Sequence, residues 1–324
     1  MSAIQTVKTG VCGDLQLHKV TDPGWALTLR QVLRDLTCDD SVSTRFPGPN
    51  PVSLDSSHFK RLRSEPYFVC EKTDGVRFML VCARAHGLNV VAIMDRTLTP
   101  YLLPLRHVPK ALYQGTSLDG ELAWNKVTRA WDFVVFDAVC VSGIPVLNTP
   151  LKDRLEAVHR ALDKYQPHPR DPVTLKLKSF VACGALSGVD AHLEGAARQY
   201  DVDGVILTPA MAPVVYGRHM GMFKLKFGDK HTVDFLVADD RRRLCVFDSG
   251  RHVAVGVLTE EATPGAIAEC SLAERRDGDQ QHVWSLVSVR TDKGTANDMF
   301  TYQKTLLNMR ENLTLESIKG LFAA

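Results

Sequence analysis

The sequence contains no run of about 18 consecutive apolar residues, the length that a membrane-spanning helix needs. Its opening residues, Met-Ser-Ala-Ile-Gln-Thr-Val-Lys, carry no apolar signal core. The formal net charge is only +2. There is thus no overall basic field. Any contact with nucleic acid must come from a local basic patch or from chemistry at the end of the nucleic-acid chain. These absences predict a soluble, intracellular protein that does not bind membranes.

Two common chemical frameworks are also missing. The eight cysteines are scattered, with no Cys-x-x-Cys pair and no histidines at zinc-binding spacing, which favours free thiols in a reducing compartment. No Gly-x-x-x-x-Gly-Lys-Ser/Thr loop occurs. A nucleotide-binding site in this chain would therefore have to hold phosphates with side chains.

The most informative stretch is residues 67–80, in which two apolar, strand-like runs flank Lys72, Asp74, Gly75 and Arg77. A lysine amine attacks phosphorus or a carbonyl only when it is uncharged, a state favoured by partial burial among cations. Arg77 supplies such a cation, and Gly75 allows a turn or a close approach of the backbone to a ligand. Taken alone, the pattern also fits a surface hairpin with a salt-bridging lysine and aspartate.

The chain before residue 235 mixes helical and strand periodicities. The proline-rich segment 46–53 is expected to be a loop spacer. An aspartate inside the apolar run 131–140 is expected to have a partner, because a buried charge rarely stands alone. Helices are expected at 25–36, at 151–165 with Thr149 as its cap, and at 188–200. Strands are expected at 77–83, 89–96, 117–124, 131–140, 176–180 and 203–209.

Beyond residue 235 the chain changes to short strands separated by polar turns, a pattern typical of an oligonucleotide-binding (OB-fold) β-barrel. A helical tail follows at 298–322. At 324 residues, two domains can each bury a core. We therefore predict an α+β protein with antiparallel sheets and flanking helices in residues 1–234, a barrel in 235–309, and a final helix near 310–324 that rejoins the first domain.

Charged side chains recur in the apolar strands. Glu121 and Asp203 each adjoin a glycine, and Lys224 and Lys226 alternate so that both point to one face of a strand. A charged turn follows at 289–297. Each feature taken singly also fits a solvated surface. Together, a lysine nucleophile, two carboxylates able to hold Mg²⁺ and several cations are the groups needed for attack on a nucleoside triphosphate.

Seven motifs follow one another along the chain: Glu-Lys-Thr-Asp-Gly-Val-Arg (71–77), Asp-Gly-Glu-Leu (119–122), Phe-Val-Val-Phe-Asp-Ala-Val (133–139), Asp-Gly-Val-Ile-Leu-Thr-Pro (203–209), Phe-Lys-Leu-Lys (223–226), Thr-Val-Asp-Phe (232–235) and Arg-Thr-Asp-Lys (290–293). In this order they resemble the motifs of GTP:RNA guanylyltransferases, the mRNA capping enzymes. The wider covalent nucleotidyltransferase superfamily also contains DNA and RNA ligases. The resemblance runs nearly end to end and looks closest to the small single-chain capping enzymes of large algal DNA viruses.

The resemblance implies that Lys72 attacks the α-phosphorus of GTP, expels pyrophosphate and carries a lysine-linked GMP. The diphosphate 5′ end of RNA then accepts the GMP and forms the cap. Glu121 and Asp203 would hold the divalent cation, Mg²⁺ or Mn²⁺. The implied GTP-binding residues are Arg77, Arg96, Glu121, Phe136, Lys178, Asp203, Lys224, Lys226, Asp234, Arg290, Asp292 and Lys293.

Some of these residues have a more specific implied role. Phe136 would stack on guanine, because an aromatic face suits any base, and Lys178 would donate to the guanine O6 acceptor. Lys224 and Lys226 would grip the α-phosphate and help to hold Lys72 uncharged. Arg290, Asp292 and Lys293 would come from the second domain to the β- and γ-phosphates when the domains close. Asp234 matches a motif position without an assigned role.

The implied partners are GTP, a 5′-diphosphate RNA end and a separate RNA triphosphatase, with the chain itself a monomer. Its expected compartment is the nucleus in a eukaryotic host or for a virus that replicates there, and otherwise the cytoplasm. Two other functions remain open. An ATP-dependent polynucleotide ligase would take label from ATP, whereas a non-catalytic binding module would need a broken motif. The sequence favours the capping chemistry, since Asp203 stands where ligases more often carry Glu.

Overall fold

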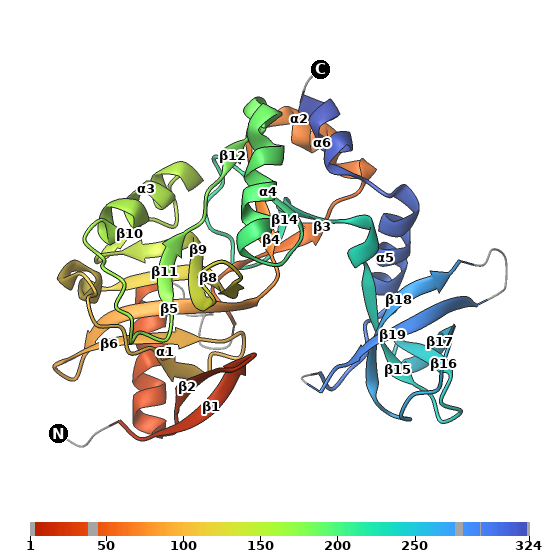
Figure 1. Ribbon diagram of the computed structural model, residues 1–324, viewed down its shortest axis with the longest axis horizontal. Coiled ribbons are helices and arrows are strands. Elements are labelled where there is room, and N and C mark those ends of the chain that lie inside the picture. Colours follow the sequence, from red (N-terminus) through yellow and green to blue (C-terminus); the bar gives the residue numbers. More distant parts are fainter. Residues whose placement is uncertain (1–3, 38–44, 276–280, 292, 323–324) are drawn as a thin grey trace. The chain divides into compact units, whose positions relative to one another are not determined.

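The computed structural model describes residues 4–37, 45–275, 281–291 and 293–322 (Figure 1). Two compact units are present. Unit 1 consists of Met1–Val52, Lys60–Lys224 and Phe322–Ala324, and unit 2 consists of Ser53–Phe59 and Leu225–Leu321. Among the described residues, no helix is both long enough and apolar enough to cross a membrane. The predicted domain limits and the return of the final helix to the first domain stay predictions.

The larger sheet of unit 1 has nine strands, in the order β1-β2-β7-β6-β5-β8-β9-β10, with β11 added alongside β9. Neighbours pair antiparallel except β11, which runs parallel to β9. The strands are β1 (Thr6–Cys12), β2 (Leu15–Val20), β5 (Val76–Ala85), β6 (Leu88–Met94), β7 (Pro100–Leu102), β8 (Thr116–Asn125), β9 (Ala130–Val141), β10 (Ile144–Pro145) and β11 (Thr174–Leu177). This confirms the predicted mixed α and β composition.

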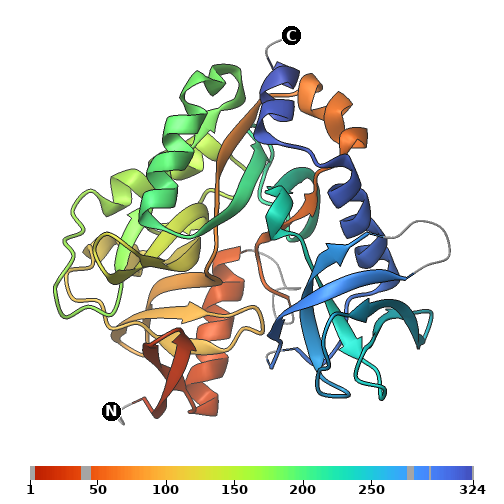
Figure 2. The same ribbon diagram turned by 45° about the vertical axis from the view of Figure 1, so that its right-hand side comes forward.

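Both faces of this sheet are buried, which explains why β5 reads as a continuous apolar run and not as an alternating one. Phe78, Leu80 and Cys82 of β5 point to a core that includes Val158 of helix α3 (Leu151–Leu162). The alternate residues Met79, Val81 and Ala83 point to a core with Leu29 and Leu33 of helix α1 (Pro23–Thr37). Figures 1 and 2 show α1 and α3 beside the sheet. The sheet therefore gives its central strands a rigid position.

The smaller sheet has five strands in the order β12-β4-β13-β14-β3. Helix α2 (Phe59–Ser64) precedes β4 in the chain, and helix α4 (Val189–Gln199) precedes β13. The strands are β3 (Pro49–Ser53), β4 (Tyr67–Thr73), β12 (Val181–Ala182), β13 (Val202–Pro209) and β14 (Gly217–Lys226). The segment 46–53, predicted as a loop spacer, is thus partly a strand. It lies at the edge of the sheet, where a proline that lacks a backbone donor is tolerated.

The stretch around Lys72 is not a hairpin, although its sequence also fits one. Strand β4 ends at Thr73 and β5 begins at Val76, but the two strands lie in different sheets. The chain crosses from one sheet to the other at Asp74 and Gly75. A side chain at Gly75 would collide with the backbone oxygen of Leu122 in β8. Glycine is required here for that close approach.

Unit 2 contains the predicted barrel, which has five strands and closes in the order β15-β16-β17-β19-β18. Its core holds Phe235 and Trp284, whose ring centroids lie 4.8 Å apart, and Tyr302 of helix α5 packs against both. The elements are β15 (Thr232–Val237), β16 (Arg243–Asp248), β17 (Arg251–Leu258), β18 (Ile267–Glu274), β19 (His282–Val289), α5 (Met299–Glu311) and α6 (Leu315–Phe322).

Two details of the helices differ from expectation. The tail forms two helices, since Asn312 adopts a left-handed conformation (φ 43°) that ends α5. Helix α3 begins after Pro150 without a side-chain cap, and the Thr149 hydroxyl donates to the backbone oxygen of Val146 instead. The predicted Thr149 cap is therefore wrong, because that hydroxyl is used by the preceding turn. Short 3₁₀ turns complete the fold: η2 (Ser56–His58), η3 (Lys110–Gln114), η4 (Cys183–Gly188) and η5 (Gly228–Lys230).

Candidate active site

A pocket of about 150 Å³ lies in unit 1 between its two sheets. Strands β5, β8 and β9 supply one side of it, and β3, β4, β13 and β14 supply the other. The lining residues are Pro49, Pro51, Cys70, Glu71, Lys72, Thr73, Arg77, Arg96, Glu121, Phe136, Asp137, Leu151, Lys178, Phe180, Ile206, Thr208 and Met222. Six of the predicted site residues, Lys72, Arg77, Arg96, Glu121, Phe136 and Lys178, are therefore brought together here.

Lys72 enters the pocket from β4, with 25% of its side chain exposed. Its Nζ donates to both carboxylate oxygens of Asp203, at 2.7 and 2.8 Å. Asp203 thus adjoins the pocket through this ion pair. From the sequence we expected cations around the Lys72 amine, whereas the structure places it against a carboxylate.

Two β-bulges set the positions of Asp203 and Phe136. Lys72 pairs with Gly204 and Thr73 with Val202, so that Asp203 is the extra residue of β13. In the larger sheet, Asp119 pairs with Asp137 and Gly120 with Val135, which leaves Phe136 as the extra residue of β9. A bulge re-aims the side chains around it. The consecutive residues Phe136 and Asp137 both line the pocket.

Arg77 forms one wall of the pocket through a buried ion pair with Asp119. Its Nε and Nη2 donate to the two carboxylate oxygens at 2.8 and 2.5 Å, and Nη1 donates to the backbone oxygen of Pro49 at 2.8 Å. Burial disfavours its charge, but Asp119 outweighs this effect and raises the pKa of Arg77. The guanidinium carbon lies 5.3 Å from the centre of the Phe136 ring. A fixed positive charge therefore flanks an aromatic face.

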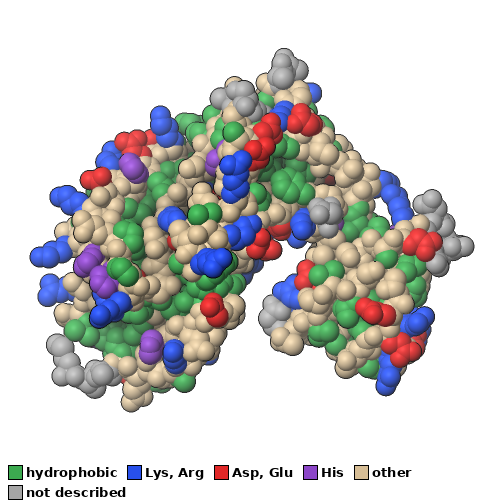
Figure 3. Space-filling view, viewed as in Figure 1, with side chains coloured by type: hydrophobic (Ala, Val, Ile, Leu, Met, Phe, Trp, Pro, Cys, Tyr) green, Lys and Arg blue, Asp and Glu red, His purple; other side chains and the backbone are tan. Residues whose placement is uncertain are grey.

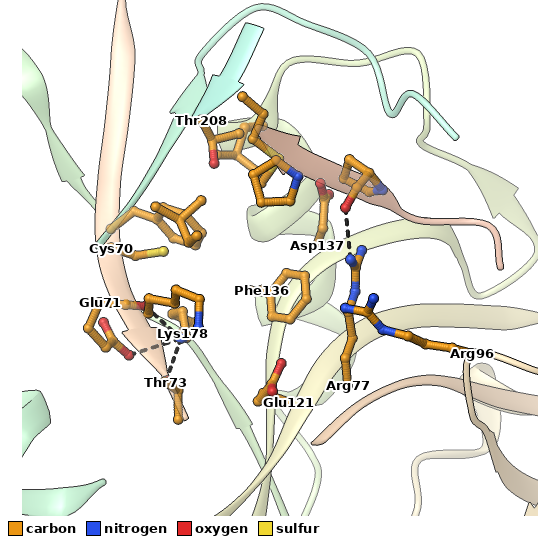
Figure 4. Close-up of a pocket in the computed structure, with 17 residues that line it drawn as sticks. Cys70, Glu71, Thr73, Arg77, Arg96, Glu121, Phe136, Asp137, Lys178 and Thr208 are labelled. Carbon is orange, nitrogen blue, oxygen red and sulfur yellow. Dashed lines mark hydrogen bonds and ion pairs between the residues drawn. The ribbon is translucent and has the colours of Figure 1, made fainter. Parts of the chain in front are cut away.

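Glu121 shares the face of β8 that carries Asp119, and it pairs in register with Arg77. Burial raises the pKa of Glu121 to about 7, although Lys178, Arg77 and Lys72 act in the opposite direction. Burial, and then the nearby charge of Arg77, lower the pKa of Arg96. Figure 4 shows Glu121 below the Phe136 ring, with Arg77 and Arg96 on one side of the ring and Lys178 on the other. The pocket therefore offers an aromatic ring with two arginines on one side and a lysine on the other.

Lys178 follows β11 and is almost fully buried. Its Nζ contacts Thr73 Oγ1 at 2.6 Å, the Glu71 backbone oxygen at 3.0 Å and Glu71 Oε1 at 3.2 Å. The other oxygen of that carboxylate lies 2.9 Å from His192 Nε2 on α4. Burial opposes the ionisation of Glu71, but His192 and Lys178 outweigh it and lower its pKa. Oxygens of Glu71 and Thr73 thus hold Lys178 at the pocket wall.

Asp137 is paired, as expected for a charged residue inside an apolar strand. Arg154 on α3, with a side chain 2% exposed, donates to it from Nε at 2.6 Å and from Nη2 at 3.0 Å. Arg154 Nη1 also donates to the backbone oxygens of Thr149 and Ala212. This buried pair joins α3 to β9 beside the pocket.

Within the described ranges, no cluster of three or more His, Cys, Asp or Glu side chains could hold a metal ion by itself. The two predicted ligands, Glu121 and Asp203, both lie near Lys72. Mg²⁺ is commonly bound by one or two carboxylates together with substrate phosphates. The donor set therefore fits a cation that arrives with a phosphorylated ligand.

The other predicted residues lie elsewhere. Lys224 lies on β14 outside the lining of the pocket, and Lys226 belongs to unit 2. In unit 2, Arg290 contacts the Asp234 carboxylate at 3.4 Å, and Lys293 also forms an ion pair with it. Asp292 falls outside the described residues. Asp234, the position without an assigned role, thus gathers Arg290 and Lys293.

Several residues that line the pocket, or that pair with one of its lining residues, were missed in the sequence. Asp119 lies two positions before Glu121 on the same strand, and this alternation could have indicated a second carboxylate on one face. Glu71 and Thr73 flank Lys72 inside the recognised motif but were not assigned roles. Asp137 was expected only to have a partner, and Phe180 carried no signal at all.

On the face drawn in Figure 3, basic side chains of the described residues lie among acidic, histidine and hydrophobic ones. This distribution agrees with the small net charge of +2.

The chain matches two protein-family models that together span most of it. Residues 9–228 match the model described as "mRNA capping enzyme, catalytic domain". Residues 222–319 match "mRNA capping enzyme, C-terminal domain". The first match includes every lining residue of the pocket, and the second includes the barrel.

Curated relatives include fungal proteins named mRNA-capping enzyme subunit alpha. The Neurospora crassa protein is 30% identical over 234 residues, which cover 65% of this chain but only 57% of that protein. The Schizosaccharomyces pombe protein is 28% identical over 84% of this chain and 79% of its own length. Among solved structures, a mycobacterial DNA ligase D complexed with ATP and MES has a TM-score of 0.43 at 13% identity, covering 75% of this chain and 93% of that one. The closer resemblance to algal-virus enzymes stays a prediction.

Proposed function

This chain belongs to the mRNA capping enzyme family, and from that membership and the pocket around Lys72 we propose that it is an mRNA guanylyltransferase. The observation that carries the proposal is that one pocket of unit 1 gathers Lys72 with Arg77, Glu121, Phe136 and Lys178. An amine that can form a covalent bond thus lies beside cations, a carboxylate and an aromatic ring. These are the groups that a nucleoside triphosphate requires.

In the proposed first step, Lys72 Nζ attacks the α-phosphorus of GTP. A P–N bond forms, the bond from the α-phosphorus to the bridging oxygen breaks, and pyrophosphate leaves. The amine must lose a proton before it attacks, and Asp203, which accepts both of its hydrogen bonds, is placed to receive that proton. In the second step, a terminal phosphate oxygen of 5′-diphosphate RNA attacks the same phosphorus, the P–N bond breaks and Lys72 regains its proton. The product carries a 5′-5′ triphosphate bridge.

The pocket supports a specific position for the base. Phe136 presents a ring face on which a base can stack. Lys178 lies across from Arg77 and Arg96 and can donate to an acceptor on the base edge (Figure 4). Guanine presents the O6 acceptor there, whereas adenine presents an amino donor. We propose that this contact favours GTP over ATP.

We propose that Glu121 and Asp203 hold a divalent cation, Mg²⁺ or Mn²⁺, together with the nucleotide phosphates. When bound, such an ion neutralises phosphate charge that develops during transfer. A cation near Glu121 would also favour its ionised form, against the burial that raises its pKa to about 7. The roles of Lys224 and Lys226 toward the α-phosphate, and of Arg290, Asp292 and Lys293 toward the outer phosphates, remain part of this proposal.

We propose a separate protein as the source of the RNA triphosphatase step that supplies the diphosphate end. The names of the fungal relatives, which describe them as alpha subunits, support such a partner. Action of this chain as a monomer, in the compartment where its host or virus makes mRNA, belongs to the same proposal.

The test is incubation of the full chain with GTP labelled at the α-phosphate, with Mg²⁺ or Mn²⁺, followed by denaturing electrophoresis. We expect a covalently labelled protein that releases its label on addition of pyrophosphate or of 5′-diphosphate RNA. Label from ATP and not from GTP would overturn the proposal and favour a polynucleotide ligase. Absence of label from either nucleotide would favour a non-catalytic binding module.

A further inference from the structure

The wall of the pocket at Lys178 has a second hollow behind it. This rear hollow encloses about 320 Å³ and is lined by parts of β4, β9, β11 and helix α4. Glu71 and Lys178 line both the pocket and the rear hollow, whereas His192 lines the rear hollow only. The Glu71–Lys178 pair therefore separates the two spaces, and His192 approaches it from the side away from the pocket.

His192 and Lys178 share the Glu71 carboxylate through different oxygens. His192 Nε2 lies 2.9 Å from Oε2, and Lys178 Nζ lies 3.2 Å from Oε1. Because an ionised carboxylate only accepts hydrogen bonds, His192 must carry its proton on Nε2 in this contact. All three side chains are shielded, with exposed fractions of 16% for His192, 5% for Glu71 and 4% for Lys178. A shielded carboxylate that loses a donor must find another or reorient.

The contacts of Lys178 make its direction depend on this carboxylate. An ammonium group has three donors. Two of them donate to Thr73 Oγ1 and the Glu71 backbone oxygen. Glu71 Oε1, at 3.2 Å, is an ion-pair partner and makes the longest of the three contacts. A ligand acceptor in the pocket would most readily replace Oε1. Glu71 can release that donor without being left unpaired, because His192 still holds Oε2.

We propose that His192, acting through Glu71, is a positioning residue that lets Lys178 turn to the six-position of the purine and so sets the preference for a 6-oxo over a 6-amino base. This inference rests on the proposed function, since it assigns a specificity device to the same pocket. Without His192, the carboxylate keeps Lys178 as its donor and draws it away from the base. His192 touches neither the base nor the phosphates.

The test compares adduct formation from GTP, inosine triphosphate and ATP in the full chain and in two variants. Inosine shares the six-position oxygen with guanine but lacks the two-amino group, so the ratio of inosine triphosphate to ATP reports the Lys178 contact alone. We expect His192→Ala to lower the GTP/ATP and the inosine/ATP ratios of kcat/KM by about tenfold each, the effect of one misplaced charged hydrogen bond. The GTP/inosine ratio should stay unchanged.

Two controls separate positioning from folding. His192→Gln keeps an N–H donor that can reach Glu71, and it should restore at least half of the lost discrimination on a logarithmic scale. His159→Ala removes an exposed histidine from α3 and should leave all three ratios as they are. Thermal unfolding of each variant identifies a loss of fold, which would lower all three rates together and leave their ratios unchanged.

The outcomes are distinct. If the unaltered chain takes no label from GTP, the proposed function fails. If the unaltered chain takes label, two results for His192→Ala would overturn the positioning role. One is unchanged GTP/ATP and inosine/ATP ratios, and the other is an equal loss of rate with all three nucleotides. A change in the GTP/inosine ratio alone would also overturn it, because the effect would then lie at the two-amino group.

Discussion

Both carboxylate oxygens of Asp203 accept hydrogen bonds from Lys72 Nζ, and Asp203 reaches this position because it is the extra residue of a bulge opposite Lys72. A regular strand would pair Asp203 with a neighbour and send its side chain to one fixed face. The bulge instead aims the carboxylate at the amine of the adjacent strand. The position of the amine is thus fixed by local backbone geometry before any nucleotide binds.

Asp203→Asn removes the charge and one of the two acceptors while it keeps the size of the side chain. We expect the rate of lysyl-nucleotide formation, measured in a single turnover, to fall by about 100-fold or more, as for the loss of a group that accepts a proton. The matched control is Asp201→Asn, two residues earlier, where an exposed aspartate pairs with Lys126 at 3.2 Å. That variant should keep the rate within about twofold, since exposed pairs contribute little. Equal losses in both variants would contradict a specific role for Asp203.

Glu121 gives a prediction about pH. Burial raises its pKa from 4.5 to about 7 in the folded chain, so between these values the folded state holds a proton that the unfolded state has released. Stability therefore falls as pH rises through this window. Glu121→Gln removes the effect. In metal-free buffer, we expect the variant and the unaltered chain to have the same free energy of unfolding at pH 4. At pH 8 we expect the value of the variant to be larger by on the order of 2 kcal/mol.

Chemical denaturation at both pH values checks this, with Glu194→Gln as the control. Glu194 lies exposed on α4 and pairs only loosely with Arg198, at 3.6 Å. Its substitution should give no gain that depends on pH. If Glu121→Gln had the same effect at pH 4 and pH 8, burial would not be what shifts the titration of Glu121.

Removing one partner of the buried Asp137–Arg154 pair is expected to cause a large loss of stability. Asp137→Ala leaves a buried guanidinium without its carboxylate, and we expect the free energy of unfolding to fall by about 3 kcal/mol or more. Arg160→Ala on the same helix α3 breaks an exposed pair with Glu156 and should change it by less than about 0.5 kcal/mol. Urea denaturation of the two variants gives the comparison. Similar values for both would mean that the buried pair does not hold α3 to β9.

Much of this architecture could be predicted because its signals are local. The barrel strands follow short apolar runs between polar turns, and helix α1 follows the spacing of Leu29 and Leu33. The candidate site could be predicted from motif order, since Lys72, Glu121 and Lys178 stand in a recognisable succession. Their proximity in one pocket is what the structure adds.

The remaining features depend on pairings between distant strands. No periodicity marks Asp203 or Phe136 as a bulge residue, because a bulge is defined by the partner strand. The edge strand at Pro49 reads as a loop from its prolines, yet the Pro49 backbone oxygen accepts from Arg77. His192 lies 121 positions from Glu71, and nothing in the sequence links them. Local sequence patterns do not indicate long-range contacts of this kind.

In the proposed reaction, Lys72 itself forms the covalent bond to the nucleotide. The most direct measurement is mass spectrometry of peptides from the full chain after reaction with GTP and Mg²⁺, under conditions that preserve a P–N bond. We expect GMP on the peptide that contains Lys72, and its complete absence in Lys72→Arg, which retains the charge but cannot serve as the nucleophile. GMP attached to another residue, or undiminished labelling of Lys72→Arg, would contradict it.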